Sequence, residues 1–244
     1  MSELELSIVL PAYREARALE TFLPKLIEEA GKLTPSFEVL VVDTHEPVDD
    51  TKDVAEKAGA RHIFRTGGNT YGDAVRSGIT ASRGRLVLFM DGDGSHNPME
   101  LPKLWDARNK ADIVIGSRYV KGGQTENPAI LIWMSQVVNQ IYRFAFRLPV
   151  KDVSNSLRLY RGEQLRALEL KSSNFDIVEE ILLRLVCGQA QATVTEVPVT
   201  FERRKAGESK RNLMAFAFSY LHSIRKMLEF KRSEQRKMHA ARKG

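Results

Sequence analysis

The amino-acid sequence predicts an α/β fold, in which a mostly parallel sheet carries helices on both faces. Between residues 4 and 115, short runs of aliphatic and β-branched residues alternate with longer segments of helical periodicity. The apolar runs are nearly continuous and do not alternate with polar residues, which is typical of parallel strands that are buried on both faces. Both observations favour a doubly covered, Rossmann-like sheet over an all-helical or sandwich fold.

The elements expected in this first part follow one another with short connections. The expected strands are LSIVL (6–10), EVLVV (38–42), RHIF (61–64), LVLFM (86–90) and DIVIG (112–116). Helical periodicity covers residues 15–31, 50–58 and 72–82, and a further helix opens at Pro98. Helices placed between strands supply the crossovers that parallel pairing requires.

The pattern changes after residue 118. The expected elements are a long amphipathic helix (130–147), a strand LRLY (157–160), a helix (176–187), a strand TVTEVPVTF (193–201) and a final helix from residue 212. No linker or repeat interrupts the chain. We therefore expect one domain over residues 1–230, made of a first half (1–118) and a second half (119–230), followed by a basic tail (231–244) that is disordered.

The charge of the chain is concentrated near its end. Residues 225–244 hold eight Lys and Arg against two Glu, which accounts for the whole net charge of +6. Such a run suits a solvated end or an anionic lipid surface better than nucleic acid, because Phe230 is its only aromatic residue. We therefore regard nucleic acid as an improbable partner.

Cysteine content and hydropathy limit the cellular environments that suit the protein. The single Cys187 excludes an internal disulfide and a multi-cysteine metal site, and it favours a reducing cytoplasm. Two apolar stretches are not expected to span a membrane. Residues 128–150 contain several amide and Arg side chains, and the stretch 213–224 is too short to cross the apolar layer. Both stretches suit helices that lie in a membrane interface or pack in a core.

A candidate metal site follows the strand at residues 86–90. Asp91 and Asp93 are two positions apart, so on an extended segment their carboxylates project to the same side. Two carboxylates with open remaining positions suit Mg²⁺ or Mn²⁺ shared with phosphate oxygens. Because Asp-Gly sequences also form solvated turns, the other strand ends decide between the two interpretations.

Those strand ends also carry polar groups, and ligands of α/β sheets bind beyond the carboxyl ends of strands. Tyr13 could stack on a base, and Asp43 could accept hydrogen bonds from a base or ribose. Arg118, Arg204 and Lys210 could stabilise a diphosphate leaving group or bind an acceptor phosphate. The plainer alternatives are packing for Tyr13, a loop cap for Asp43 and solvated surface charge for the cations.

Other cofactor classes fit less well. The Gly-containing segment 67–77 lacks the spacing of a dinucleotide or Walker fingerprint, which excludes NAD and ATP folds of those types. No second cluster of ligands supports a two-metal phosphohydrolase.

Seven segments, in order, resemble family-two glycosyltransferases, and most closely the dolichol- and polyprenyl-phosphate mannose synthases. They are LSIVLPAYRE, VLVVD, GDAVRSGI, LVLFMDGDGSHNP, DIVIGSRYVKGG, DVSNSLRLYR and EVPVTFERRKAGESK. The resemblance covers residues 4–230. The resemblance implies a GT-A fold, with a nucleotide-binding first half, an acceptor-facing second half and inversion at the anomeric carbon by direct displacement.

The resemblance also implies roles for individual residues. Pro11, Tyr13 and Glu15 resemble nucleotide contacts, and Asp43 resembles a contact to the base or ribose. Two loops depart from the usual pattern, residues 44–51 after Asp43 and residues 70–72 where Gly-Lys-Gly is common. These departures leave the nucleotide open between GDP and UDP.

The remaining implied contacts are to the metal and the phosphates. Those contacts are Asp91 and Asp93 for the metal and diphosphate, Ser95 as a third candidate ligand where many relatives have Gln, and Arg118, Arg204 and Lys210 for the acceptor phosphate or donor diphosphate.

The implied activity is metal-dependent transfer of mannose from GDP-mannose to a polyprenyl or dolichyl phosphate. The enzyme would lie peripherally on the cytoplasmic face of a membrane, and a membrane-spanning partner subunit could replace the anchors that some relatives carry. One alternative is transfer from UDP-glucose to a lipid phosphate or another sugar acceptor. A remote alternative is a non-catalytic protein that binds nucleic acid or membrane through the basic tail.

Overall fold

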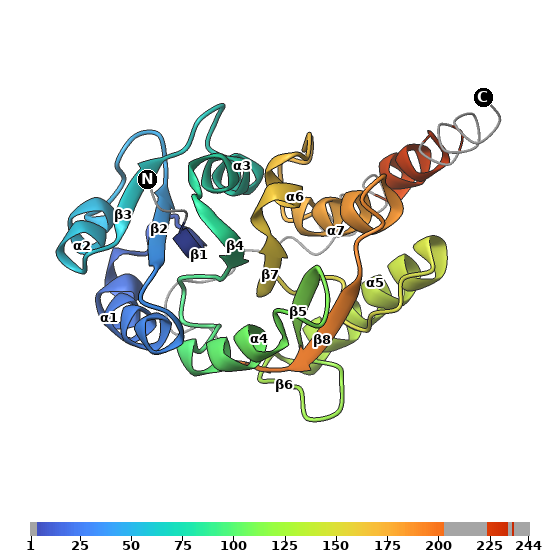
Figure 1. The fold of residues 1–244 in the computed structure, drawn as a ribbon, viewed down its shortest axis with the longest axis horizontal. Coiled ribbons are helices and arrows are strands. Elements are labelled where there is room, and N and C mark those ends of the chain that lie inside the picture. Colours follow the sequence, from blue (N-terminus) through green and yellow to red (C-terminus); the bar gives the residue numbers. More distant parts are fainter. Residues whose placement is uncertain (1–3, 203–223, 234–235, 237–244) are drawn as a thin grey trace.

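The computed structural model describes residues 4–202, 224–233 and 236, and within them a seven-stranded sheet forms the centre of the molecule (Figure 1). The strand order is β3-β2-β1-β4-β7-β5-β8. The strands are β1 (Leu4–Pro11), β2 (Phe37–Asp43), β3 (Arg61–Phe64), β4 (Gly84–Phe89), β5 (Ile113–Ser117), β7 (Arg158–Arg161) and β8 (Val194–Pro198). Only β7 runs antiparallel to its neighbours β4 and β5. The predicted α/β fold with a mostly parallel sheet is confirmed.

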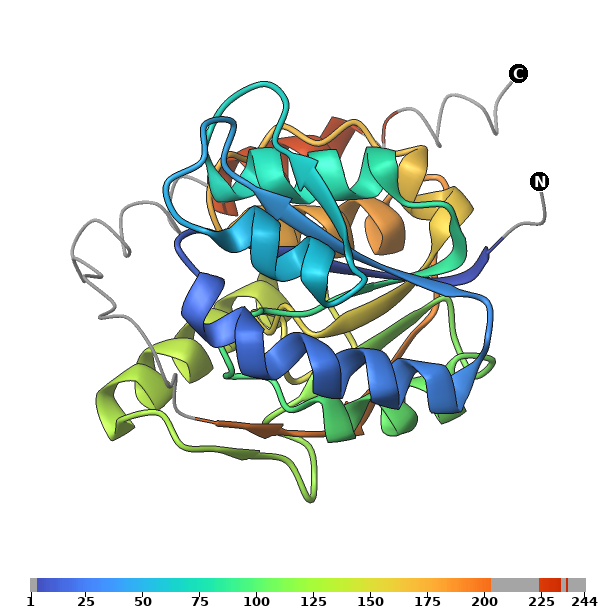
Figure 2. The same ribbon diagram turned by 90° about the vertical axis from the view of Figure 1, so that its left-hand side faces the viewer.

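Helices cover both faces of this sheet, and Figure 2 shows α1 and α3 on opposite sides of the strands. One face carries α1 (Ala16–Leu33), α2 (Thr51–Lys57), the 3₁₀ turn η1 (Pro98–Glu100) and α4 (Leu101–Ala107). The other carries α3 (Tyr71–Ala81), α6 (Gly162–Arg166) and α7 (Ile177–Cys187). Helix α5 (Ala129–Phe146) lies at the edge of the molecule beyond β8 (Figure 1).

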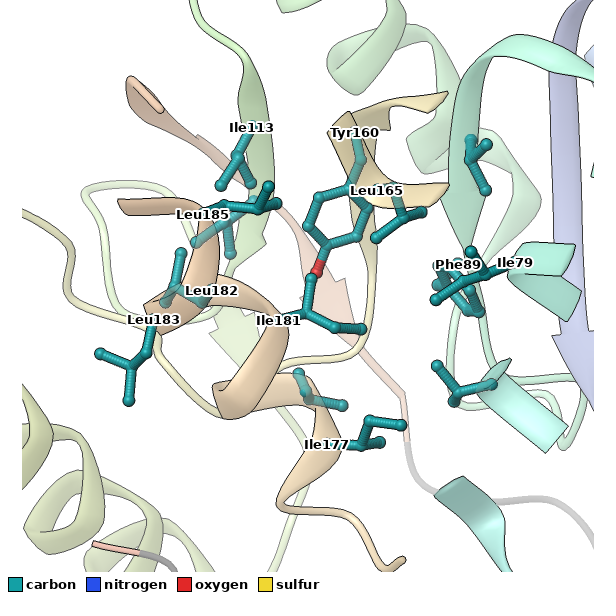
Figure 3. Close-up of a cluster of buried hydrophobic side chains, with 14 of the residues drawn as sticks. Ile79, Phe89, Ile113, Tyr160, Leu165, Ile177, Ile181, Leu182, Leu183 and Leu185 are labelled. Atoms are coloured by element: carbon teal, nitrogen blue, oxygen red, sulfur yellow. The ribbon is translucent and has the colours of Figure 1, made fainter. Parts of the chain in front are cut away.

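The sheet separates two hydrophobic clusters because successive side chains of a strand point to opposite faces. In β1, Ile8 and Leu10 join the cluster under α1 and α4, whereas Val9 joins the cluster under α3 and α7. Figure 3 shows the second cluster, where Tyr160 of β7 and Ile181 of α7 face each other. The continuous apolar runs in the sequence thus reflect strands buried on both faces.

Two features of the second half could not be read from the sequence. The expected strand at residues 157–160 exists as β7, but it is inserted between β4 and β5. The expected strand at residues 193–201 is divided into β8 and the short β9 (Thr200–Phe201), which pairs with β6 (Gln124–Thr125) in a separate two-stranded sheet. The division falls after Pro198, which has no N–H to continue a ladder.

A final helical segment covers residues 224–233 and packs against α7 and the end of α5. The Arg184 guanidinium lies 4.5 Å from the centre of the Phe230 ring, and the Lys231 Nζ donates a hydrogen bond of 3.3 Å to the Ala145 carbonyl. The first three residues assigned to the tail, 231–233, therefore continue this helix. The part of the expected helix before residue 224 lies outside the described residues.

A buried carboxylate joins three elements at the amino-terminal end of the sheet. Glu38 of β2 accepts hydrogen bonds from the Ser7 hydroxyl (2.7 Å), the Arg83 backbone N–H (2.9 Å) and the Arg61 guanidinium (2.7 Å). The Arg83 guanidinium donates to the same carboxylate at 2.7 Å. Burial alone would raise the pKa of Glu38, but these hydrogen bonds outweigh it and hold the pKa below its ordinary value.

We predict that Glu38→Gln lowers the free energy of unfolding at pH 7 by about 2–3 kcal/mol, measured by urea denaturation. A carboxyl whose folded pKa is depressed adds stability that is present above its unfolded pKa of about 4.3 and is lost as the pH falls through the folded value. The difference between wild type and variant should therefore shrink in acid. The exposed Glu28→Gln serves as a control, and an equal loss in both variants would contradict the prediction.

Candidate active site

The described residues form a cavity of about 380 Å³ at the carboxyl edge of the sheet. Its polar wall comes from the ends of β1, β4 and β5 and from the loop before β7, which carries Ser154, Asn155 and Ser156. Its apolar wall comes from α5 and α7 and includes Leu131, Val138 and Val178, among others. A ligand in this cavity would meet both charged groups and hydrocarbon.

Asp91 and Asp93 both line the cavity, as the spacing after the strand predicts. The Asp91 carboxylate accepts a hydrogen bond of 2.8 Å from the Ser156 hydroxyl, and its side chain is 27% exposed. Asp93 Oδ1 accepts from the backbone N–H of Ser95 (2.9 Å) and from its hydroxyl (2.5 Å). Ser95 therefore orients Asp93, and its part as a metal ligand stays a prediction.

His96 connects this loop to the rest of the edge. Its Nδ1 accepts the Asp91 backbone N–H at 3.0 Å, so the ring proton sits on Nε2, which donates to the Asn155 Oδ1 at 3.1 Å. The Asn155 Nδ2 in turn donates to the Gly116 carbonyl at 2.5 Å. His96 and Asn155 are buried, so this chain of hydrogen bonds rigidly joins the ends of β4 and β5.

Arg118 also lines the cavity, but its charge is paired. Its Nε and Nη2 donate to the two oxygens of the buried Asp152, both at 2.8 Å, and Nη2 also donates to the Ser154 hydroxyl at 2.9 Å. The bidentate pair fixes the guanidinium plane against the Phe201 ring, whose centre is 5.5 Å from the Arg118 Cζ. The buried Asp152 thus balances the positive charge of Arg118, and a contact of Arg118 with a phosphate stays a prediction.

The structure places three of the four predicted nucleotide contacts on the cavity wall and the fourth away from it. Pro11, Tyr13 and Glu15 line the cavity, and Tyr13 is 54% exposed. Asp43 is fully buried and does not line it, because its carboxylate accepts from the Thr44 N–H at 2.7 Å and lies 3.4 Å from the His62 Nε2. A contact of Asp43 with a nucleotide therefore stays a prediction.

Two of the predicted phosphate-binding residues, Arg204 and Lys210, lie outside the described residues. The described chain leads toward them through β9, where the Phe201 ring lies 5.2 Å from the His96 ring and the Glu202 N–H donates to the Ser95 carbonyl at 2.9 Å. Strand β9, which precedes Arg204 and Lys210 in the chain, thus lies next to the loop that carries Asp91.

Several lining residues were missed by sequence reasoning. Arg65 follows β3 directly, so the strand-end argument that singled out Asp43 would also have found it. Tyr71 opens α3 and stacks on Phe175 with ring centres 4.5 Å apart, and burial raises the pKa of Tyr71 well above its ordinary value. Phe175 lies in none of the matched segments, and Ser156 lies in DVSNSLRLYR but has no role assigned from the sequence; the fold brings both to this edge.

The donor set of the cavity fits a divalent metal shared with phosphates. Among the described residues, no three His, Cys, Asp or Glu side chains gather as a closed site. Asp91 and Asp93 offer carboxylate oxygens in one cavity and leave most coordination positions to a ligand, which is the arrangement that Mg²⁺ and Mn²⁺ accept with nucleotide diphosphates. Ser156 and Ser95 orient these carboxylates by hydrogen bonds, as is usual around metal ligands.

A mostly parallel sheet with an inserted antiparallel strand and an Asp-x-Asp pair at its carboxyl edge defines the class of GT-A glycosyltransferases. Residues 7–168 match the family model described as glycosyl transferase family 2. The chain belongs to glycosyltransferase family 2, as the resemblance in the sequence predicts.

Two relatives illustrate this kinship. The chain is 32% identical over 237 residues to a dolichol-phosphate mannosyltransferase of Pyrococcus furiosus, and the match covers 93% of this chain and 64% of that protein. It is 35% identical over 214 residues to an undecaprenyl-phosphate mannosyltransferase of Micrococcus luteus, covering 83% and 85%. The chain therefore spans less than two thirds of the length of the Pyrococcus protein.

Solved structures confirm the fold. Glucosyl-3-phosphoglycerate synthase of Mycobacterium tuberculosis, in complex with Mn²⁺, uridine diphosphate and phosphoglyceric acid, superposes with a TM-score of 0.69 at 18% identity. The match covers 92% of this chain and 78% of that one. At this identity the likeness concerns the fold alone.

We predict that Asn155→Ala lowers the free energy of unfolding by about 2–4 kcal/mol, because it leaves the His96 Nε2–H and the Gly116 carbonyl buried without their partner. Urea denaturation measures the effect. Asn109→Ala, at an exposed turn, is the matched control and should change stability by less than about 0.5 kcal/mol. Similar values for the two variants would show that the buried chain of hydrogen bonds contributes little.

Proposed function

We propose that the protein transfers mannose from GDP-mannose to a polyprenyl or dolichyl phosphate at the cytoplasmic face of a membrane. The observation that carries this proposal is that one cavity is lined both by a pair of carboxylates and by apolar side chains of α5 and α7. Asp91 and Asp93 suit a metal-bound diphosphate, and the α5 wall suits the first part of a lipid chain. The two mannosyltransferase relatives are named for acceptors of that chemistry, which supports the choice.

The chemistry needs little from the protein beyond positioning. An acceptor phosphate oxygen is already anionic, so it can attack the anomeric carbon of the sugar without a general base. The new bond from that oxygen to the carbon forms as the bond from the carbon to the diphosphate oxygen breaks, and the nucleoside diphosphate leaves with the electron pair. A bound Mg²⁺ or Mn²⁺ supplies the positive charge that stabilises the diphosphate.

Residues of this chain would orient the reactants. Asp91 and Asp93 hold the metal, and Ser156 and Ser95 fix their carboxylates. Arg118 lines the same cavity, contacts the Ser135 hydroxyl of α5 at 3.3 Å and is proposed to bind the acceptor phosphate. Arg204 and Lys210 complete the proposed phosphate contacts.

A stripe of exposed apolar side chains on α5 supports a membrane location. We call it the α5 stripe; its members are Ile130, Trp133, Val137, Ile141 and Phe144. Their spacing of three and four residues places them on one face of the helix, and Phe144 is 85% exposed. No helix among the described residues is long and apolar enough to cross a membrane. A helix lying flat in the interface would bury this stripe in lipid.

Basic groups lie at the carboxyl end of α5. Lys231 of the final helical segment bonds to the Ala145 carbonyl of α5, and Arg147 at the end of α5 is exposed. Anionic headgroups attract such cations while the stripe enters the apolar layer. Lys231 thus brings one cation of the final helical segment to the carboxyl end of α5.

We expect Asp91→Ala to lower transfer at least about a hundredfold, because the diphosphate loses its charge stabilisation. The assay is transfer of radiolabelled mannose from GDP-mannose to polyprenyl phosphate with Mg²⁺ or Mn²⁺, followed by the same assay with UDP-glucose. Asp106→Ala on α4, an exposed carboxylate, should keep wild-type turnover. A folded Asp91→Ala enzyme with near wild-type turnover would refute the metal site. Preferential transfer from UDP-glucose would show that the donor is UDP-glucose and not GDP-mannose.

Membrane binding should depend on the α5 stripe. The double variant Trp133→Glu/Phe144→Glu should bind anionic liposomes at least about tenfold more weakly in a flotation assay, since two large apolar side chains no longer enter lipid. Gln136→Glu/Gln140→Glu adds the same charge to exposed polar positions of the same helix and is the matched control. Equal loss in both variants would indicate that net charge, and not the stripe, governs binding.

A further inference from the structure

The two carboxylates proposed to hold the metal stand on a loop that has little stiffness of its own. Gly92 separates Asp91 from Asp93, and Gly94, which follows, has a φ of +81°. Glycine leaves the backbone more conformational freedom than any other residue. A bound Mg²⁺, by contrast, requires its ligand oxygens at about 2.1 Å in nearly octahedral directions. Other contacts must therefore hold this loop in shape.

His96 closes the loop from within the same segment. Its Nδ1 accepts the Asp91 backbone N–H at 3.0 Å, so a side chain five residues later in the chain fixes the backbone of the first carboxylate. His96 is 1% exposed and is not among the residues that line the cavity. Any effect of His96 on a bound metal must therefore act through Asp91.

Two backbone groups determine which ring nitrogen of His96 carries the proton. The Asp91 N–H can only donate, and the Gly116 carbonyl can only accept. Because the Asn155 Nδ2 donates to that carbonyl at 2.5 Å, its Oδ1 faces His96 and accepts from Nε2 at 3.1 Å. The ring proton therefore sits on Nε2, and the lone pair of Nδ1 faces the Asp91 N–H. Turning over either side chain would break one of these bonds.

The ring of His96 is also held by packing. The Phe201 ring meets it edge to face, with ring centres 5.2 Å apart and an angle of 84° between the planes. The two residues also form an isolated antiparallel bridge through their backbones. Phe201 and Asn155 thus restrict the ring on different sides, and His96 ties the position of the Asp91 backbone to β9 and β5.

The bond from His96 differs from the other contacts of the two aspartates. Ser156 donates to the Asp91 carboxylate at 2.8 Å, and the Ser95 hydroxyl donates to the Asp93 carboxylate at 2.5 Å. Both hydroxyls use carboxylate oxygens, which are the atoms that a cation would bind. The bond to Nδ1 uses only the Asp91 backbone N–H, so it can persist unchanged when the carboxylates bind a metal.

We propose that His96 is a positioning residue of the metal site. Its Nδ1 holds the Asp91 backbone so that the Asp91 carboxylate meets the divalent cation that is bound with the nucleoside diphosphate. The inference rests on the proposed function, because it concerns the metal assigned there to Asp91 and Asp93. Removal of a group that orients a metal ligand typically weakens metal binding about 10- to 100-fold. A histidine that only packs would change stability and leave metal binding as it is.

Two substitutions separate the two ring nitrogens. His96→Asn places an acceptor oxygen close to the position of Nδ1 and leaves that of Nε2 empty, whereas His96→Gln places an amide nitrogen at Nε2 and leaves Nδ1 empty. Calorimetry measures the dissociation constants of GDP and of UDP with EDTA and with Mn²⁺. Their ratio is the gain in affinity from the metal.

The expected gains differ between the two variants. For the preferred nucleotide, the wild type should bind at least about tenfold more tightly with Mn²⁺ than with EDTA. His96→Asn should keep this gain within about threefold, and His96→Gln should lower it about tenfold, because only Asn retains an acceptor for the Asp91 N–H. Affinities in EDTA should be the same in all proteins. Asn109→Ala, at an exposed turn, is the control and should keep the wild-type gain.

Thermal denaturation of the same proteins separates positioning from packing. Lower melting temperatures with a wild-type gain in both variants would make His96 a structural residue and overturn the proposal, and so would an equal loss of gain in both. If His96→Gln does not fold, NMR of the ¹⁵N-histidine-labelled wild type with Mg²⁺ and nucleotide decides: a proton on Nε2 supports the proposal, and a proton on Nδ1 overturns it. A wild type that gains nothing from Mn²⁺ contradicts the proposed metal site itself.

Discussion

Strand β7 runs antiparallel between β4 and β5, and the geometry of the candidate site depends on this insertion. An antiparallel strand brings its amino-terminal end to the edge where its parallel neighbours have their carboxyl ends. The loop before β7 therefore crosses the cavity, and Asp152, Asn155 and Ser156 reach Arg118, His96 and Asp91 from it. A parallel strand in the same place would send this loop to the opposite edge of the sheet.

The loop is held in place by a charge buried beneath it. Arg158, the first residue of β7, is fully buried and donates to the carbonyls of Asn155 (2.8 Å), Val153 (2.5 Å) and Val178 (2.9 Å). These bonds connect the loop to the start of α7. The orientation of the Asp91 carboxylate is thus set by a network that extends into the core, and not by the short loop after β4 alone.

The sequence predicts the edge of the sheet where the site lies, because apolar runs locate strands and the residues after them share one edge. Asp91, Asp93, Arg118 and Tyr13 were found in this way. Periodicity does not show which strand pairs with which, so neither the insertion of β7 nor the lining by Ser156 could be predicted. A strand end also does not fix a side-chain direction, and the Asp43 carboxylate is turned inward by the Thr44 N–H.

The placement of β7 also determines the order in which the sheet can be completed. In the described structure β5 pairs only with β7 and β8, both of which are made later in the chain. During synthesis β5 emerges with no strand beside it, whereas β1 to β4 can already associate. The first half, residues 1–118, is therefore not a separable folding unit: a nascent chain that stops near residue 118 has an unpaired edge strand and no Asp152 for Arg118.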